Sequence, residues 1–138
     1  MKMLIALFLL SMAGLAQAGE QRTAESSLAE AYFAGGCFWC TEADLEKIPG
    51  VTEVVSGYSG GQVENPSYAE VSSGGTGHRE SVKVIYDPDV VSYKQLVDTF
   101  WKIFDPTDAG GSFGDRGHQY TSAIYYQTEE EKRIAERS

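Results

Sequence analysis

The chain has 138 residues, of which 42% are hydrophobic and 12% aromatic, and this size and composition fit one globular domain rather than two. Its formal net charge is -9 at pH 7, with 11 Lys and Arg against 20 Asp and Glu, and the sequence shows no cluster of basic residues. We do not expect it to bind nucleic acid, because non-specific binding to phosphates depends on clustered Lys and Arg.

The chain opens with MKMLIALFLLSMAGLAQA, which has the layout of a secretory signal peptide. Lys2 precedes an apolar run, and small residues lead up to Ala18. A membrane anchor is the alternative, but it needs about 20 apolar residues, and Ser11 and Gly14 interrupt this run. We expect residues 1–18 to be removed and the mature protein to be secreted or periplasmic.

Residues 19–30 are polar and lack periodicity, which predicts a flexible lead-in before a fold that starts near Ala31. The patterns beyond that point predict strands at 31–36, 51–59, 79–87 and 122–126, and helices at 37–48, 92–104 and 128–138. Two long polar loops, 60–78 and 105–122, separate them, and the first has room for one helical turn. The sequence therefore predicts an α+β layer whose loops carry the function.

Two of the predicted helices begin with capping boxes. Ser92 is followed three residues later by Gln95, and Thr128 by Glu131. In this pattern each side chain bonds the backbone N–H of the other residue. The second helix has no stop signal before the sequence ends.

The only two cysteines of the chain, Cys37 and Cys40, lie three positions apart at an expected helix start, behind a glycine pair. A thiolate is the reactive form of cysteine, and the unpaired N–H groups of a helix start stabilise it, so Cys37 is the better-placed nucleophile. Cys40 lies one turn further on the same face, where it can resolve an oxidised intermediate as a disulfide.

Three alternatives stay open for this pair. A structural disulfide is one, although so small a loop restrains the unfolded chain weakly. A zinc site is another, but only His78 and His118 could complete it, at irregular spacings, and we expect them to be loop hydrogen-bonding residues. A thioredoxin-like disulfide oxidoreductase is the third; it needs a proline loop facing the pair, and Pro66 and Pro106 are not evidently placed for that.

Five segments occur in order from about Tyr32 onward: GGCFWCTEADLEKIPGV, VVSGYSGG, NPSYAEV, GTGHRESVKVIYDP and GHQYTSAIYY. Together they resemble the A-type peptide methionine sulfoxide reductases. The resemblance implies an α+β, two-layer ferredoxin-like sandwich with helices packed on a mixed sheet of four to five strands. It also implies a protein that binds no metal, nucleotide or other cofactor and is regenerated by an external dithiol such as thioredoxin. We expect the protein to be a monomer.

By this resemblance, the chain reduces the S-epimer of free or protein-bound methionine sulfoxide and so repairs oxidised proteins. Cys37 matches the nucleophile, which attacks the sulfoxide sulfur, becomes a sulfenic acid and releases methionine. Glu80 matches the acid that protonates the sulfoxide oxygen, and Tyr68 and Tyr120 match phenols that bond it. A neutral carboxylic acid suits this chemistry, because the sulfur is electrophilic only once its oxygen is hydrogen-bonded or protonated.

The remaining matches concern binding and recycling. Phe38 and Trp39 match the pocket for the substrate's methyl group, and Asp115 matches a contact to its backbone. Most members have glycine where this chain has Cys40 and draw the resolving cysteine from a C-terminal tail, so we expect a Cys37–Cys40 disulfide here. Members also continue past the last helix, which implies that the domain at 31–138 is truncated. A truncated chain that binds methionine without turnover is a further alternative.

Overall fold

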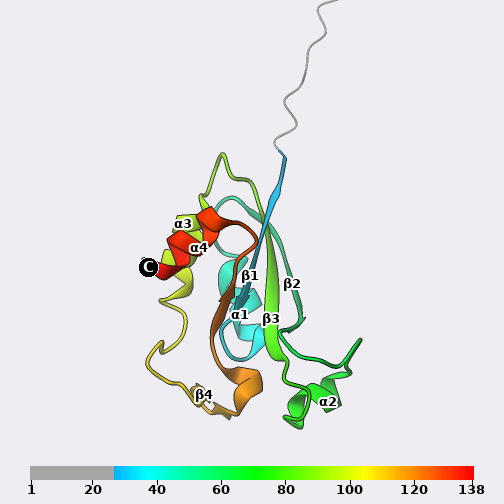
Figure 1. Ribbon diagram of the computed structural model, residues 1–138. Helices are drawn as coiled ribbons and strands as arrows, with labels where there is room; N and C mark the ends of the chain where they lie inside the picture. The colour runs from blue at the N-terminus through cyan, green and yellow to red at the C-terminus, as the bar shows by residue number, and fades with distance from the viewer. Residues whose placement is uncertain (1–26) are drawn as a thin grey trace, which may run out of the picture.

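The computed structural model describes residues 27–138, so the predicted signal peptide lies outside the described part (Figure 1). Among the described residues, no helix has the length and apolar character needed to cross a bilayer. In chain order the elements are β1 (Ala29–Ala34), α1 (Phe38–Leu45), β2 (Val51–Ser59), α2 (Tyr68–Ser72), β3 (Arg79–Tyr86), α3 (Tyr93–Phe100), β4 (Gly111–Ser112), β5 (Asp115–Arg116), the 3-10 helix η1 (His118–Tyr120), β6 (Ala123–Tyr125) and α4 (Glu129–Glu136).

The four longer strands form one sheet in the order β2-β3-β1-β6, and every neighbouring pair is antiparallel. Two split βαβ units, β1-α1-β2 and β3-α3-β6, generate this order, which is the ferredoxin-like arrangement. The α+β, ferredoxin-like prediction is therefore confirmed. We expected a mixed sheet, but every strand is antiparallel to its neighbours. The two strands of each βαβ unit are parallel to each other but not adjacent, because β3 lies between β1 and β2, and β1 lies between β3 and β6.

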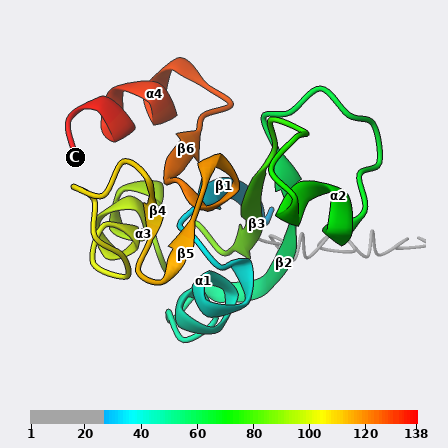
Figure 2. The same ribbon diagram turned by 90° about the horizontal axis from the view of Figure 1, so that it is seen from below.

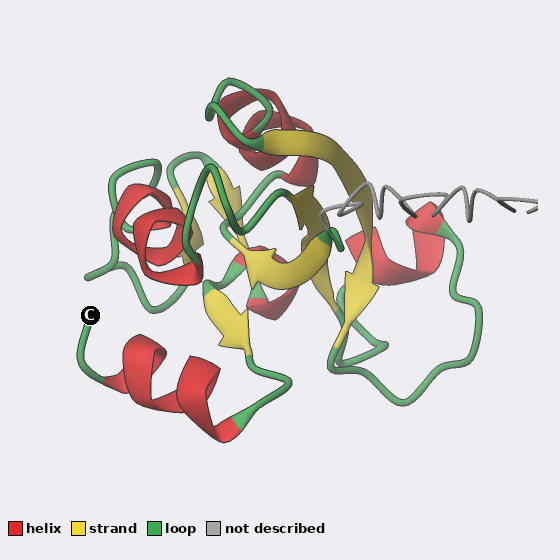
Figure 3. Cartoon of the chain, turned by 90° about the horizontal axis from the view of Figure 1, so that it is seen from above, coloured by secondary structure: helices red, strands yellow, loops and turns green. Residues whose placement is uncertain are grey.

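The first strand begins at Ala29, two residues before the expected start of the fold, because Ala29 and Glu30 pair with Tyr86 and Ile85 of β3. The strands predicted at 51–59, 79–87 and 122–126 are present as β2, β3 and β6. Figure 3 shows the helices around the strands of the central sheet.

One face of the sheet carries the core. Phe33 of β1 pairs with Val82 of β3, and both are buried against α1 and α3. The Phe33 ring stacks on Phe100 of α3 with a centroid separation of 4.8 Å. Alternate residues of a strand point to the same face, which explains why every second residue of β3 is apolar or buried here. The buried core consists of Ala31, Phe33, Phe38, Leu45, Val54, Val82, Val84, Tyr86, Val91, Tyr93, Leu96, Val97, Phe100 and Phe104.

The helices are shorter than the sequence predicted. α1 ends at Leu45 rather than residue 48, and α3 ends at Phe100 rather than residue 104. Beyond each end the backbone closes i to i+3 turns, as in the bond from the Ile48 N–H to the Leu45 carbonyl. Such tightened turns satisfy terminal carbonyl groups while the chain leaves the helix. Apolar periodicity continues through these turns, so it overestimates helix length.

The two capping boxes have different outcomes. The Ser92 and Gln95 box is formed in both directions at the start of α3. At the start of α4, the Thr128 hydroxyl accepts the Glu131 N–H at 3.1 Å, but the Glu131 carboxylate accepts the Gln127 N–H at 2.6 Å instead of that of Thr128. The second box is therefore half formed.

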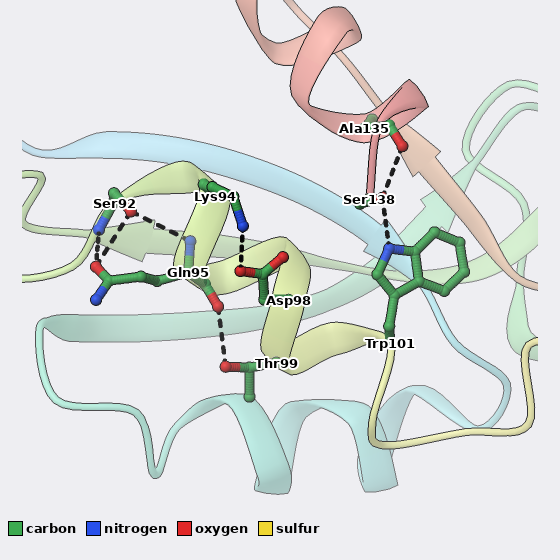
Figure 4. A network of polar contacts seen from close by, with 8 residues as sticks. All are labelled: Ser92, Lys94, Gln95, Asp98, Thr99, Trp101, Ala135 and Ser138. Carbon is green, nitrogen blue, oxygen red and sulfur yellow. Dashed lines mark hydrogen bonds and ion pairs between the residues drawn. The ribbon is translucent and has the colours of Figure 1, made fainter.

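Helix α4 lies beside α3 (Figures 1 and 4). Ile134 packs against the core from α4, although no residue of this helix is fully buried. The Trp101 indole N–H, just after α3, donates to the Ser138 hydroxyl at 2.6 Å, and that hydroxyl donates to the Ala135 carbonyl at 2.7 Å. The packing of Ile134 and the two hydrogen bonds of the Ser138 hydroxyl therefore attach the end of α4 to the rest of the domain.

We expect Phe100→Ala to lower the free energy of unfolding by about 3–5 kcal/mol, because it leaves a cavity where a fully buried ring stacked on Phe33. Phe113→Ala is the matched control, since that ring is 73% exposed and its loss should change stability by less than about 0.5 kcal/mol. Urea unfolding of both variants measures the difference. Equal losses would contradict the placement of Phe100 at the centre of the core.

Candidate active site

The turn between β1 and α1 requires its glycine pair. Gly36 has φ +94, and a Cβ there would lie 2.4 Å from the Ser112 Cβ; a Cβ on Gly35 would lie 3.0 Å from the Phe100 ring. The chain therefore passes between the α3 side of the core and the β4–β5 hairpin before it reaches Cys37. Gly36 therefore has no room for a side chain, and a side chain at Gly35 would require the Phe100 ring to shift.

Cys37 is the N-cap residue of α1, and the backbone bonds at this helix start fix its neighbourhood. Its carbonyl accepts the Cys40 and Thr41 N–H groups, each at 3.1 Å. The next N–H group, that of Phe38, points to β3 and donates to the Glu80 carboxylate at 3.0 Å. The nucleophile candidate and the acid candidate are thus joined through one residue.

Glu80 is almost fully buried, with 2% of its surface exposed. Burial raises the pKa of its carboxyl, the bond from Phe38 opposes that shift, and the charge of Asp115 adds to it. A carboxyl with a raised pKa keeps its proton to higher pH than an exposed glutamate and can donate that proton to a bound group.

Cys40 lies exposed on the first turn of α1. Its interaction with the Cys37 side chain raises the pKa of the Cys40 thiol, and partial burial and the charges of Asp115 and Asp44 act in the same direction. Cys40 therefore tends to remain a thiol. Both cysteines are free, and their sulfur atoms are close enough to interact.

Three aromatic rings form a stack at the start of α1. Phe38 is buried, whereas Trp39 and Tyr68 are 64% and 48% exposed. The Trp39 and Tyr68 rings are nearly parallel, with centroids 5.9 Å apart, and Phe38 lies 5.6 Å from Trp39 and 6.3 Å from Tyr68. Tyr68 reaches them from α2, in the first of the two long loops. This arrangement offers a small apolar surface beside Cys37.

A tyrosine that we did not single out in the sequence completes this group. Tyr58 of β2 is the cross-strand neighbour of Glu80, and its ring lies 5.7 Å from that of Phe38. Burial raises the pKa of Tyr58, and the charges of Glu80 and Tyr68 add to the shift. Tyr58 is four residues after Val54 in β2, so both side chains lie on the core face. Its place next to Glu80 follows from the register between β2 and β3, which the sequence patterns did not predict.

Tyr120 and Asp115 come from the second long loop. Burial raises the pKa of Tyr120, and the charges of Glu80, Tyr68, Asp115 and Cys37 raise it further. The charge of Asp115 acts on Glu80 and Cys40 as well. Both residues therefore lie in the same electrostatic neighbourhood as the cysteines, although more than 70 positions separate them in sequence.

Asp115 is the first residue of β5 in the β4–β5 hairpin, whose two strands are labelled in Figure 2. Ser112 pairs with Asp115 across the hairpin and contacts the β1–α1 turn through its hydroxyl, which donates to the Gly35 carbonyl at 3.5 Å. Arg116 makes two bonds to the Asp108 carboxylate, at 2.5 Å and 2.8 Å. This segment, predicted as a loop, is therefore an ordered hairpin with its own ion pair.

As expected, the two histidines form hydrogen bonds with backbone groups of the long loops. The His78 ring accepts the Gly61 N–H at 3.1 Å through Nδ1, so its Nε2 donates to the Val63 carbonyl at 2.7 Å. The His118 Nε2 lies 3.0 Å from the Gly77 carbonyl. Within residues 27–138, no group of three or more His, Cys, Asp or Glu side chains is arranged to hold a metal ion.

The structure thus places all eight predicted site residues around the start of α1. They come from separate parts of the fold: Cys37, Phe38, Trp39 and Cys40 from the start of α1, Tyr68 from α2, Glu80 from β3, Asp115 from β5 and Tyr120 from η1. Two neighbouring thiols can supply the electrons that reduce a small molecule with a polar sulfur–oxygen bond. A buried acid and phenol groups can donate a proton or hydrogen bonds to its oxygen.

Comparison with known proteins points to the same chemistry. Residues 29–138 match the family model described as peptide methionine sulfoxide reductase. The chain is 56% identical over 108 residues to the peptide methionine sulfoxide reductase MsrA/MsrB of Vibrio cholerae and to the MsrA of Bacillus velezensis. These alignments cover 78% of this chain in both cases, but 29% and 61% of those relatives. The chain therefore spans less than two thirds of their length.

Solved structures agree with the fold. Methionine sulfoxide reductase A of Corynebacterium diphtheriae superposes with a TM-score of 0.75 at 33% identity, covering 83% of this chain and 57% of that one. The reduced form of Mxr1 from Saccharomyces cerevisiae superposes with a TM-score of 0.73 at 30% identity, covering 80% and 67%. These similarities give no support to the thioredoxin-like alternative.

The raised pKa of Glu80 has a consequence for stability. Its contribution to folding is fully present below pH 4.5, the ordinary value for a glutamate, and is lost as the pH rises through the raised pKa. We therefore expect Glu80→Gln, which stays neutral, to gain free energy of unfolding relative to the wild type between about pH 4 and pH 7. Urea unfolding across this range measures the gain.

Glu53→Gln, at an exposed position of β2, is the matched control and should show no comparable trend. A difference between Glu80→Gln and wild type that stays constant with pH would mean that Glu80 titrates as it does in the unfolded chain.

Proposed function

The chain belongs to the peptide methionine sulfoxide reductase family, of the A type, and from this premise we propose that it reduces the S-epimer of methionine sulfoxide, free or in proteins. Its role is then the repair of oxidised proteins. The observation that carries this proposal is the bond between the Phe38 N–H and the Glu80 carboxylate, which fixes a buried acid beside Cys37.

Binding comes first in the proposed reaction. The methyl group of the sulfoxide lies against Phe38 and Trp39, whose neighbouring rings favour an apolar group and soft sulfur contacts. The sulfoxide oxygen points to Glu80 and accepts hydrogen bonds from Tyr68 and Tyr120, which stabilise it without adding charge. Asp115 binds the backbone of the substrate.

The chemical step transfers oxygen to the enzyme. Glu80 gives its proton to the sulfoxide oxygen, and the Cys37 thiolate attacks the sulfur, which is now electrophilic. The oxygen passes to Cys37 as a sulfenic acid, and methionine leaves as the thioether. The substrate sulfur is reduced by two electrons and the Cys37 sulfur is oxidised by two.

Recycling uses the second cysteine. The Cys40 sulfur attacks the sulfenic acid, the hydroxyl group leaves as water, and a Cys37–Cys40 disulfide forms. The bond from the Cys40 N–H to the Cys37 carbonyl, at 3.1 Å, supports this step, because it keeps the two cysteines together in the first turn of α1. An external dithiol of the thioredoxin class then reduces the disulfide, and no bound cofactor takes part.

We propose further that the enzyme is a monomer that works outside the cytoplasm. The N-terminal pattern of Lys2 followed by an apolar run supports export, and the net charge of -9 argues against nucleic acid as a partner. In an oxidising compartment, the disulfide persists until a reductant reaches it.

The cysteine roles predict different fates for two variants. Cys37→Ser should abolish reduction of the S-sulfoxide, because it removes the nucleophile. Cys40→Ser should complete one turnover and then stop when thioredoxin is the reductant, because no neighbouring thiol resolves the intermediate. Mass spectrometry after one turnover should find the oxidised sulfur on Cys37. Repeated turnover of Cys40→Ser with thioredoxin would remove Cys40 from the proposed cycle.

The role of the acid predicts a rate effect. Glu80→Gln should lower the single-turnover rate by roughly 10²- to 10⁴-fold, the usual contribution of a positioned acid, while binding changes far less. Glu53→Gln should keep the wild-type rate. If Glu80→Gln also keeps it at every pH, the phenols alone activate the sulfoxide.

A further inference from the structure

We infer that Phe113, at the tip of the β4–β5 hairpin, determines specificity for protein-bound over free methionine sulfoxide. Its ring contacts the polypeptide on one side of the oxidised residue. The inference rests on the proposed function and deepens it, because it assigns a residue that distinguishes between the two forms of the substrate.

The first observation is the exposure of the ring. Phe113 is 73% exposed, the highest value among the exposed large apolar residues of the described chain. Trp39 and Tyr68, also exposed, stack on each other at the site. Within residues 27–138, no aromatic ring contact involves Phe113. Its apolar surface is thus free to contact a bound molecule.

The second observation is the backbone at this position. Phe113 and Gly114 form the two-residue connection between β4 and β5, and Phe113 has φ 50, in the left-handed region. Glycine or asparagine is preferred at such turn positions, because a bulky residue is strained there. A strained phenylalanine that is 73% exposed contributes little to the fold, and strained residues of this kind cluster at functional sites.

The third observation is the rigid link between this tip and the cysteines. Ser112, the residue before Phe113, packs against Gly36 in the turn that leads to Cys37. The charge of Asp115, two residues after Phe113, acts on Cys40. Arg116 reinforces the hairpin, with one N–H to the Phe113 carbonyl at 3.4 Å in addition to its pair with Asp108. The backbone of the hairpin tip is therefore fixed next to the turn that leads to Cys37.

The occupant that fits this hairpin tip is a polypeptide. The side chain of a free amino acid is accommodated by Phe38, Trp39 and Glu80, at the centre of the site. Only a substrate that continues beyond the oxidised residue extends as far as the hairpin tip. An exposed aromatic ring contacts apolar side chains of many shapes, which suits an enzyme that repairs oxidised methionines in varied sequences.

The test compares two substrates with dithiothreitol as reductant: free methionine S-sulfoxide and a nine-residue peptide that carries the same sulfoxide between leucine residues. Phe113→Asn removes the ring and tolerates the left-handed backbone. We expect it to raise KM for the peptide about tenfold, equivalent to ~1.4 kcal/mol, with kcat and both constants for the free amino acid within about twofold. Phe113→Tyr should restore the peptide KM.

Val90→Asn is the matched control, because Val90 is an exposed apolar residue beyond the other end of β3, away from Glu80. This variant should keep the wild-type KM and kcat for both substrates. Equal changes for both substrates, or none for the peptide, overturn the inference. A defect of Phe113→Asn that appears only when thioredoxin replaces dithiothreitol assigns the ring to reductant docking and overturns it too.

A binding measurement separates this inference from the proposed function. Fluorescence anisotropy of the labelled sulfoxide peptide with the Cys37→Ser protein requires no turnover, and adding Phe113→Asn should weaken that binding about tenfold. If the wild type reduces neither substrate but the binding difference is present, the proposed function fails while Phe113 keeps its role. Unchanged binding overturns the role of Phe113.

Discussion

The bond from the Phe38 N–H to the Glu80 carboxylate is the interaction on which the site depends. It joins the first residue of α1 to the core face of β3, and so fixes where Cys37 and the aromatic stack lie relative to the buried acid. A carboxyl group in the interior is unfavourable unless it is hydrogen-bonded. One backbone N–H meets that need, and leaves the carboxyl with a raised pKa.

Three tyrosines surround the Phe38–Glu80 bond and affect the electrostatic environment of the Glu80 carboxyl. Tyr58, Tyr68 and Tyr120 reach the neighbourhood of Glu80 from three separate elements, and each has an aromatic ring that excludes water. Excluding water strengthens electrostatic interactions near the carboxyl. The loops that carry Tyr68 and Tyr120 are held by hydrogen bonds from the rings of His78 and His118 to backbone carbonyls. The Gln119 amide adds a bond to the Ser72 carbonyl at 2.9 Å.

Local patterns in the sequence were enough to predict the four strands of the main sheet and the starts of α1, α3 and α4 to within two residues. Alternation in β3 and the capping box at Ser92 depend on neighbours within a few positions, so they can be read without the fold. The motifs around Cys37 and Glu80 also identified the family. Tyr58 and the β4–β5 hairpin were missed, because the first depends on strand register and the second on a contact between Ser112 and Gly36 across 76 positions. Helix ends were overestimated, since terminal turns keep apolar spacing.

The sheet order leaves β2 at one edge, with nine residues. Such an edge presents backbone N–H and carbonyl groups along which strands of other molecules can add, the first step of aggregation. This strand has an irregular register between Val51 and Glu53, and Glu53 places a charge on its exposed side. Bulges and charges are devices that discourage such pairing. The edge strand that pairs with β3 beside Glu80 is thereby protected, and it presents Tyr58 inward while its outer edge discourages the addition of another strand.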